Sequence, residues 1–348
     1  MNQESIKELH SFGRQIIENS VIGGNLSFLH DSLTDENRER MTIADIGRRL
    51  AITEEGYGMF TRIGKPTKPV PSSIFNRAWE FEYELFIRDT LWFAHFCINN
   101  EGKLCYMNFY RKPSYVCPSY FNIHKVLSED ICQKPKIVYT KPALRKTTHL
   151  PVSVLIHTVV HVDIDGHIGL RYPFKDMEYL AQKKIGLIRG EYSGWSEPDP
   201  VISMAKLCIN KAISLKEASK IVLIVHSFAA LMIKEILADF NGKIGGIVLL
   251  NPAWEAAPGS NLRNMSKQNV PKGIPCLIIG SEYDQILTVQ QYEKWKKWMP
   301  SSEYIVFPKT DHFIMDCDYI PEDFEYKSWE RHVNVEIIHH MRTWINSL

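Results

Sequence analysis

The residues whose types and order could support covalent chemistry begin with Ser227. It follows closely on an apolar run, IVLIV at residues 221–225, whose β-branched residues predict a buried strand. After it comes FAALMIKEILADF, which is rich in helix formers with apolar residues at helical spacing. Such a strand–turn–helix lifts a hydroxyl above the carboxyl ends of a parallel sheet, where open α/β folds bind ligands. Ser227 is therefore a candidate nucleophile, although a serine that only caps the helix fits this stretch equally well.

A serine nucleophile needs a general base, and the base needs a carboxylate that orients it. The order serine, acid, histidine along the chain accompanies a turn of this kind. Two later strands end in suitable loops, because IPCLIIG runs toward Asp284 and YIVFP runs toward His312. Both loops follow the carboxyl ends of strands, so we expect Asp284 and His312 to converge with Ser227 above the sheet.

Neighbouring acids and histidines are weaker candidates for these roles. Glu282 and Asp311 are also acidic, but Glu282 should still be emerging from its strand, and Asp284 is better placed. His226 precedes the serine and should point elsewhere on a tight turn. His157 ends the strand VSVLIH near the site, and we interpret it as structural or as part of the pocket rather than as the base.

An oxyanion hole needs hydrogen-bond donors aimed at the developing negative charge. One donor should be the backbone N–H of Phe228, at the start of the helix after the serine. The second should come from the loop after VSVLIH, at Thr158 or Val159. The other residues expected to line the substrate pocket are His157, Val160, Trp254 and Tyr283.

The elements that must hold these groups alternate, from about residue 115 onward, between short apolar strands and amphipathic helices. This alternation predicts an α/β architecture, a mostly parallel sheet with helices on both faces. Strands are expected at residues 136–140, 152–157, 184–189, 221–225, 244–250, 274–279 and 304–307. Helices are expected at residues 174–182, 201–215, 230–240, 289–299 and 332–345.

The first third of the chain has a different pattern. Residues 5–50 predict helices interrupted by a charged turn, DENRER, and a loop with three prolines follows at residues 64–71. Aromatic-rich strands are then expected at residues 79–87, 90–98 and 103–110. Helices followed by a curved antiparallel sheet predict a small α+β domain at residues 1–114, ahead of a catalytic domain at residues 115–348. The aromatic residues of these strands favour packing in a hydrophobic core. The alternative is a concave sheet surface that holds or shapes a substrate.

Composition limits the classes of function. The 348 residues are 45% hydrophobic and 23% charged with a formal net charge of +1, which is ordinary for a globular protein. No Lys/Arg run suggests a nucleic-acid partner, and no apolar run approaches the about 18 residues of a membrane span. The polar N-terminus lacks an apolar signal core. Seven scattered cysteines without C-x-x-C spacing predict reduced thiols in a cytoplasmic protein, with no zinc site.

These motifs resemble the α/β-hydrolase superfamily. More narrowly, the chain is similar to bacterial serine hydrolases that carry a small cystatin-like or nuclear-transport-factor-like domain before the catalytic domain. The resemblance implies an α/β-hydrolase fold with Ser227 as nucleophile, Asp284 as acid and His312 as base, without a metal or organic cofactor. It rests on PFKD (173–176), IGLIR (185–189), GSEYDQILTVQQYEKW (280–295) and VFPKTDHFIMD (306–316).

The chain departs from that family where the family has glycine. Thr158 follows the first histidine, and Val225 and Ala229 occupy the glycine positions around the serine. Because glycine permits close backbone approach, these residues predict a tighter and more apolar site than a general esterase has. The segment after IVLLNPAW (247–254) is short for a lid, so we expect the N-terminal domain, with Trp254, to cover the pocket instead.

Together these features predict a serine hydrolase that cleaves an ester, thioester or related acyl bond of a small organic substrate through an acyl-enzyme. One alternative is a biosynthetic acyltransferase, cyclase or lyase on the same scaffold, with water excluded from the site. Another is a non-catalytic binding protein on a degenerate scaffold, against which the complete serine–aspartate–histidine set argues. The expected partner is a small acyl substrate, free or carrier-bound, and the sequence carries no signal for oligomeric state.

Overall fold

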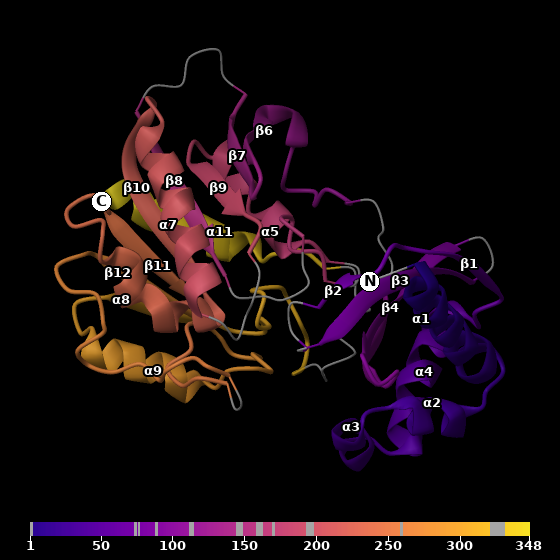
Figure 1. Cartoon of the computed structure of the whole chain (residues 1–348). Coiled ribbons are helices and arrows are strands. Elements are labelled where there is room, and N and C mark those ends of the chain that lie inside the picture. Colours follow the sequence, from indigo (N-terminus) through magenta and orange to yellow (C-terminus); the bar gives the residue numbers. More distant parts are fainter. Residues whose placement is uncertain are drawn as a thin grey trace. The chain divides into compact units, whose positions relative to one another are not determined.

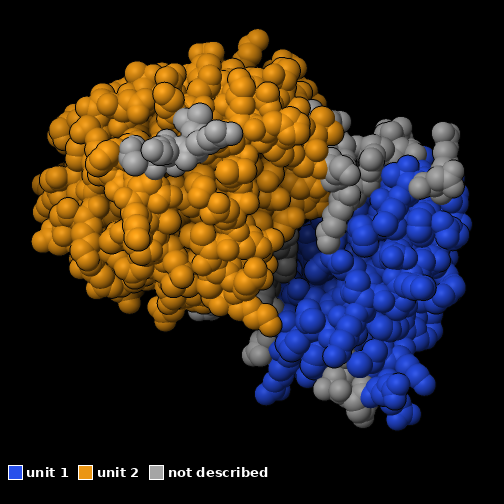
Figure 2. Space-filling model, turned by 90° about the horizontal axis from the view of Figure 1, so that it is seen from above, with its two compact units in different colours: residues 1–114 blue, residues 115–348 orange. Residues whose placement is uncertain are grey.

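Two units, each with its own hydrophobic core, make up the computed structural model of this chain: Met1–Ser114 and Tyr115–Leu348 (Figure 2). The structure describes residues 3–72, 75, 77–87, 90–110, 115–143, 149–157, 163–168, 171–192, 198–257, 260–320 and 331–348. Within these ranges, no helix combines the length and the apolar character that crossing a membrane requires.

Eight strands of the C-terminal unit form one sheet, in the spatial order β13-β12-β11-β10-β8-β9-β7-β6. The strands from β13 to β9 in this order run parallel, whereas β7 pairs antiparallel with β9, and β6 with β7. The strands are β6 Val126–Gln133, β7 Lys136–Pro142, β8 Leu150–Ile156, β9 Gly186–Gly190, β10 Ala218–His226, β11 Gly246–Leu250, β12 Cys276–Ser281 and β13 Glu303–Phe307.

Alternate residues of each central strand enter different cores, which explains why the strands are apolar throughout. Along β10, Leu223 and Val225 belong to one core, and Val222 and Ile224 belong to the other. Helices cover both faces, with α7 in front of the strands and α11 behind them (Figure 1). The first core includes residues of α7 Pro198–Ser214, α8 Ile233–Leu237 and α9 Val289–Trp298, and the second includes residues of α6 Tyr179–Gln182 and α11 Val335–Ser347. The predicted α/β architecture is confirmed.

Three details of this unit differ from the sequence-based expectation. The segment expected as one helix at residues 230–240 is a 3₁₀ helix, Ser227–Met232, followed by the short α8. Strand β6 was not predicted, because most of its residues are exposed or half-buried and it lacks the alternating apolar pattern. A short 3₁₀ turn, Ile123–Lys125, precedes β6.

The helix expected at residues 174–182 is divided into α5 Pro173–Asp176 and α6. Two buried carboxylates flank the break and bind different partners. Asp176 accepts hydrogen bonds from the hydroxyl of Tyr115 at 2.8 Å and the backbone N–H of Val333 at 2.9 Å. Glu178 instead binds the guanidinium of Arg189. This short segment therefore connects the start of the unit, strand β9 and the chain just before α11.

The N-terminal unit contains an antiparallel sheet in the order β1-β3-β4-β5, with β2 also paired to β3. One face packs on the helices, because Phe81, Leu85 and Phe96 share a core with Ile16 and Leu29. The strands are β1 Arg62–Pro66, β2 Val70–Pro71, β3 Ala78–Ile87, β4 Thr90–Asn99 and β5 Leu104–Tyr110. The helices are α1 Gln3–Ile16, a π-helical continuation at Ile17–Ile22, α2 Leu26–Ser32, α3 Asp35–Arg40 and α4 Ile43–Tyr57.

Two expectations for this unit were wrong. The proline-rich segment at residues 64–71 is not only a loop, because it contains part of β1 and all of β2, which lie beside β3 where proline is tolerated at a sheet edge. The segment DENRER is helix α3 rather than a turn. Asp35 and Glu36 lie in the first turn and both arginines in the last, and Arg40 pairs with Glu36 at 3.0 Å.

Candidate functional site

The serine lies at the carboxyl end of β10, between the parallel neighbours β8 and β11. Its φ angle is +59°, in the left-handed region that non-glycine residues rarely adopt. Such a conformation costs about 1–3 kcal/mol and persists only where the surroundings enforce it. Val225 and Ala229, both 0% exposed, pack in the core on either side of the turn. The chain therefore builds a strained serine turn with valine and alanine, not glycine, on either side of it.

Three side chains from separate loops meet at this turn. His312 Nε2 lies 2.9 Å from Ser227 Oγ, and His312 Nδ1 lies 2.7 Å from Asp284 Oδ2. The side chains of His312 and Asp284 are only 3% and 1% exposed. Burial by itself raises the pKa of Asp284, but the charge and hydrogen bond of His312, together with Tyr292 and the Leu287 N–H, lower it below the ordinary value. The carboxylate is thus kept ionised beside the imidazole.

The other two acids near this site lie away from the imidazole nitrogens. Asp311 is 1% exposed and pairs with Arg171, whose Nη1 lies 2.6 Å from Oδ2. Its Oδ1 accepts the backbone N–H groups of Phe313 and Met315, at 2.8 and 3.1 Å. Asp311 therefore shapes the turn that carries the histidine. Glu282 is exposed and accepts only the backbone N–H of Lys309 among the hydrogen bonds observed in the described chain.

The expectation that His226 points away from the site was wrong. Its ring lies 4.8 Å from the ring of His312, and its Nε2 donates to the His312 carbonyl oxygen at 2.8 Å. Burial, then the nearby His312, lower the pKa of His226 to about 3. His226 is thus a neutral support beneath the loop that carries His312.

His157 is also buried, and it lies at the end of β8 between aromatic rings. Its ring centroid is 4.3 Å from that of Phe174 and 4.7 Å from that of Tyr192. Burial, then the nearby His226, lower the pKa of His157 to about 3. The two histidines that precede His312 in the site's loops are therefore neutral at ordinary pH.

Asn251 and Gln285 hold the histidine loop and were not singled out by the sequence. Asn251 has a φ of +43° and donates from Nδ2 to the carbonyl oxygen of His312 at 2.9 Å and to Ser281 Oγ at 3.0 Å. Gln285 accepts the backbone N–H of His312 at 3.3 Å. A polar residue directly after β11, at the same edge as Ser227, is the signal that could have identified Asn251.

Of the remaining predicted site residues, the structure describes Phe228, Trp254 and Tyr283. Phe228 follows the serine in the first turn of its 3₁₀ helix. Backbone N–H groups in the first turn of a helix have no acceptor within the helix, so they can bind another group. Trp254 packs edge-on against Trp295, with ring centroids 5.4 Å apart, and is 9% exposed. Tyr283 is half-buried, and its backbone N–H donates to the Thr310 carbonyl at 2.9 Å. The residues Thr158, Val159 and Val160 lie outside the described part of the chain.

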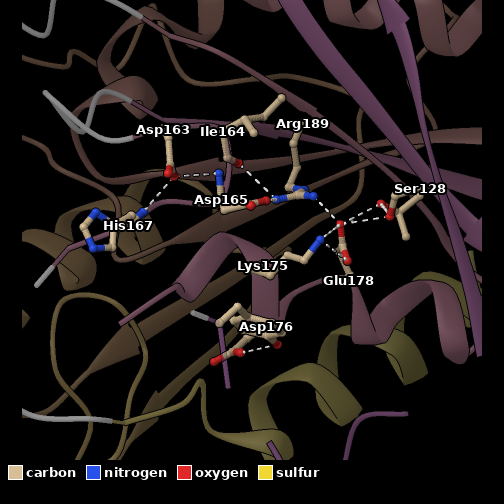
Figure 3. Close-up of polar contacts among 11 residues, drawn as sticks. Ser128, Asp163, Ile164, Asp165, His167, Lys175, Asp176, Glu178 and Arg189 are labelled. Carbon is tan, nitrogen blue, oxygen red and sulfur yellow. Dashed lines mark hydrogen bonds and ion pairs between the residues drawn. The ribbon is translucent and has the colours of Figure 1, made fainter. Parts of the chain in front are cut away.

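A buried polar network holds the segment at residues 163–168, downstream of β8. Figure 3 shows Arg189, at the end of β9, between the carboxylates of Asp165 and Glu178. Arg189 also donates to the Ile164 carbonyl at 3.0 Å. Arg189 and Glu178 are 2% and 0% exposed, so each neutralises a charge that has no access to water. Glu178 accepts further bonds from Ser128, Thr140 and Lys175.

Among the residues that the structure describes, no group of three histidine, cysteine, aspartate or glutamate side chains is arranged to hold a metal ion. The described cysteines are all free thiols.

Comparison with known proteins gives one family match. A family described as serine hydrolase matches residues 189–331, which is less than half of the chain and includes Ser227, Asp284 and His312. No curated protein sequence matches the chain.

Several solved hydrolase structures are similar at low identity. Est1E from Butyrivibrio proteoclasticus has 12% identity and a TM-score of 0.46, covering 64% of this chain and 100% of its own. A Pyrobaculum calidifontis esterase has 14% identity and a TM-score of 0.46, covering 65% of this chain and 86% of its own. Dienelactone hydrolase from Anabaena variabilis ATCC 29413 has 10% identity and a TM-score of 0.45, covering 64% and 99%.

Proposed function

We propose that this protein is a serine hydrolase of the α/β-hydrolase type, which cleaves an ester, thioester or related acyl bond of a small organic substrate. The observation that carries the proposal is the continuous chain of hydrogen-bond distances from Ser227 Oγ through His312 to Asp284. Nucleophile and base within hydrogen-bond reach, with the base oriented by a third group, is the signature of an activated serine. The family match over residues 189–331 agrees with it.

Each group has one role in the proposed reaction. His312 Nε2 accepts the Ser227 hydroxyl proton as Oγ bonds to the acyl carbon, and the carbonyl electron pair moves to oxygen. Asp284 fixes the tautomer with the proton on Nδ1 and stabilises the imidazolium that forms. Collapse of the tetrahedral species breaks the bond to the alcohol or thiol, which takes the proton from His312. Water then repeats these steps on the acyl-enzyme and releases the acid.

The backbone N–H of Phe228 is proposed as one oxyanion donor, and Thr158 or Val159 as the other. The loss of one such donor typically lowers turnover by about 10²–10³-fold. The half-buried Tyr283, in the loop just before Asp284, stays a candidate for the pocket wall.

The test uses a fluorophosphonate probe and short-chain nitrophenyl esters and thioesters. We expect the wild-type protein to be labelled and to turn over at least one ester, and Ser227→Ala to lose labelling entirely. Turnover should fall by about 10⁴-fold or more in Ser227→Ala and in Asp284→Asn. The matched control is Glu282→Gln, an exposed acid of the same loop, which should keep activity within about threefold because solvated surface changes have small effects.

The outcomes separate the candidate functions. Labelling without turnover, combined with acyl transfer to an added amine, alcohol or thiol, would favour the biosynthetic transferase that the tight turn at Val225 and Ala229 suggests. Absence of labelling in the folded wild-type protein would refute both nucleophilic functions and leave a binding protein.

The N-terminal unit is proposed to be a cystatin-like accessory domain that shapes access to the catalytic domain. Its helices packed on one face of an antiparallel sheet are consistent with such a domain. Deletion of residues 1–112 should then change the order of preference among esters of different acyl length. Unchanged kinetics and stability would contradict this role.

A further inference from the structure

Asp284 is bound by four donors, and only one of them takes part in the proposed proton transfer. Its Oδ1 accepts the backbone N–H groups of Ile286 and Leu287, both at 2.8 Å, and its Oδ2 accepts from His312 Nδ1 and the hydroxyl of Tyr292. A carboxylate offers about four lone-pair sites, so this one is saturated. With 1% of the side chain exposed, water does not compete for any of them.

Tyr292 is the one side chain other than His312 among these four donors. It lies in α9, is 0% exposed, and packs in the core that also contains Trp295. Its position depends on Gly280 near the end of β12, where an added Cβ would overlap the Tyr292 ring. The chain thus leaves space on the strand for this ring and aims its hydroxyl at the same carboxylate oxygen that His312 uses.

We propose that Tyr292 is a positioning residue of the catalytic triad. Its hydroxyl holds the Asp284 side chain in place and limits how strongly that carboxylate stabilises the protonated form of His312. The inference rests on the proposed function, because it concerns the base of that reaction. It assigns to α9, which contributes no triad residue, control over the pH range in which the serine is activated.

The direction of the effect follows from sharing one oxygen between two donors. The hydroxyl of Tyr292 withdraws part of the negative charge of Oδ2 from the imidazole. Without it, more of that charge acts on His312, and the imidazolium becomes more stable relative to neutral imidazole. The neutral imidazole is the form that accepts the serine proton. A variant without the hydroxyl should therefore need a higher pH to become active.

The other titratable groups near this pair are not removed by the change and act equally in both proteins. Burial, then Asp284, raise the pKa of Tyr292, so the phenol stays protonated across the working range. The surrounding groups are His226 at the end of β10, His157 at the end of β8, Tyr304 on β13, and the Asp311–Arg171 pair.

The test is the pH dependence of kcat/KM for Tyr292→Phe with a nitrophenyl ester. We expect the midpoint of the acidic limb to rise by about 0.5–1 pH unit, a size typical of changes in a neighbouring charge. Activity well above that midpoint should stay within about tenfold of wild type. The matched control is Tyr120→Phe, which loses a 2.8 Å hydroxyl bond to the Val333 carbonyl in the same unit and should leave the midpoint unchanged.

A second variant reverses the sign without changing the packing. Incorporation of 3,5-difluorotyrosine at position 292 alone gives a stronger donor of nearly the same shape, and the acidic midpoint should fall. Unmoved midpoints in both variants would overturn the inference, while loss of activity in Ser227→Ala would still support the hydrolase. If Ser227→Ala keeps full activity, the proposed function itself fails, whatever Tyr292 does.

Discussion

At the scale of single residues, the candidate site contains two buried, neutral histidines besides His312. His226 and His157 lie beside the triad, and both are buried at 3% exposure. Burial lowers the pKa of each to about 3. Both imidazoles are polar, uncharged packing: His226 donates to the His312 carbonyl oxygen, and His157 packs between the rings of Phe174 and Tyr192.

This arrangement predicts acid sensitivity. Unfolded histidine has a pKa near 6.5, above the folded values of about 3, so the unfolded chain binds more protons between these limits. The stability from each histidine is therefore complete above about pH 6.5 and is lost as the pH falls toward 3. The expected slope is about 1.4 kcal/mol per pH unit for each histidine.

Urea denaturation at pH 7, 6 and 5 measures this slope. His226→Gln keeps a donor near Nε2. It should lower the slope of stability against pH by the contribution of one histidine, about 1.4 kcal/mol per pH unit. The same change at the exposed His124 should leave it unaltered. An equal slope in wild type and His226→Gln would show that His226 already binds a proton in the folded protein.

At the scale of elements, the turn after β10 holds backbone strain at Ser227, the proposed nucleophile. Ser227 has a φ of +59° and no glycine precedes or follows it in the turn. The flanking strands β8 and β11 pair with β10 up to Val225 and His226, so the residues just before the turn are fixed in the sheet. The strain is held by the sheet, and it aims the hydroxyl at His312.

Two substitutions at Ser227 measure the backbone strain of the turn independently of the proposed reaction, because both remove the hydroxyl. Ser227→Ala and Ser227→Gly both lose the contact with His312, but only glycine adopts a positive φ without a steric cost. We expect Ser227→Gly to be more stable than Ser227→Ala by about 1 kcal/mol, measured as the free energy of unfolding. Equal or reversed stabilities would mean that the turn relaxes when the serine is replaced.

The network around Arg189 is a second element-scale feature, since it joins β9 to α6 and the segment after β8. Arg189→Met should leave the buried carboxylate of Glu178 with Lys175 as its remaining cationic partner, and should cost about 3 kcal/mol in the free energy of unfolding. Lys141→Met is the control, because its pair with Glu129 is 23% and 51% exposed and should contribute less than about 1 kcal/mol. A loss below 1 kcal/mol for Arg189→Met would contradict the anchoring role.

At the scale of the whole molecule, the hydrophobic residues gather into cores that stay within the two units. The two cores of the sheet contain only residues after position 115, and the core of the N-terminal unit contains only residues before it. Each unit therefore has the apolar packing that independent folding requires.

The corresponding prediction is that residues 115–348 fold alone. The fragment should show cooperative thermal unfolding and keep fluorophosphonate labelling of Ser227, because all three triad residues and their supports lie within it. Far-UV circular dichroism and labelling measure both properties. A fragment that is soluble but unlabelled, or that unfolds without cooperativity, would show that the first unit is needed for the fold or for the site.

The sequence by itself determined the alternation of strands and helices, the division in composition near residue 115, and the order of Ser227, Asp284 and His312 after separate strands. These features are local, because hydrophobic periodicity and turn residues act over a few positions of the chain. They are enough to indicate an α/β sheet with candidate groups at one edge.

Only the tertiary structure decided which groups touch. It paired Asp311 with Arg171, far away in sequence, and placed His226 under His312 rather than away from it. It also brought the Tyr292 hydroxyl to Asp284. These contacts depend on how whole strands and helices pack, because a loop side chain meets partners that no local pattern specifies. The spacing of residues suggested a triad, and the packing of the sheet determined its surroundings.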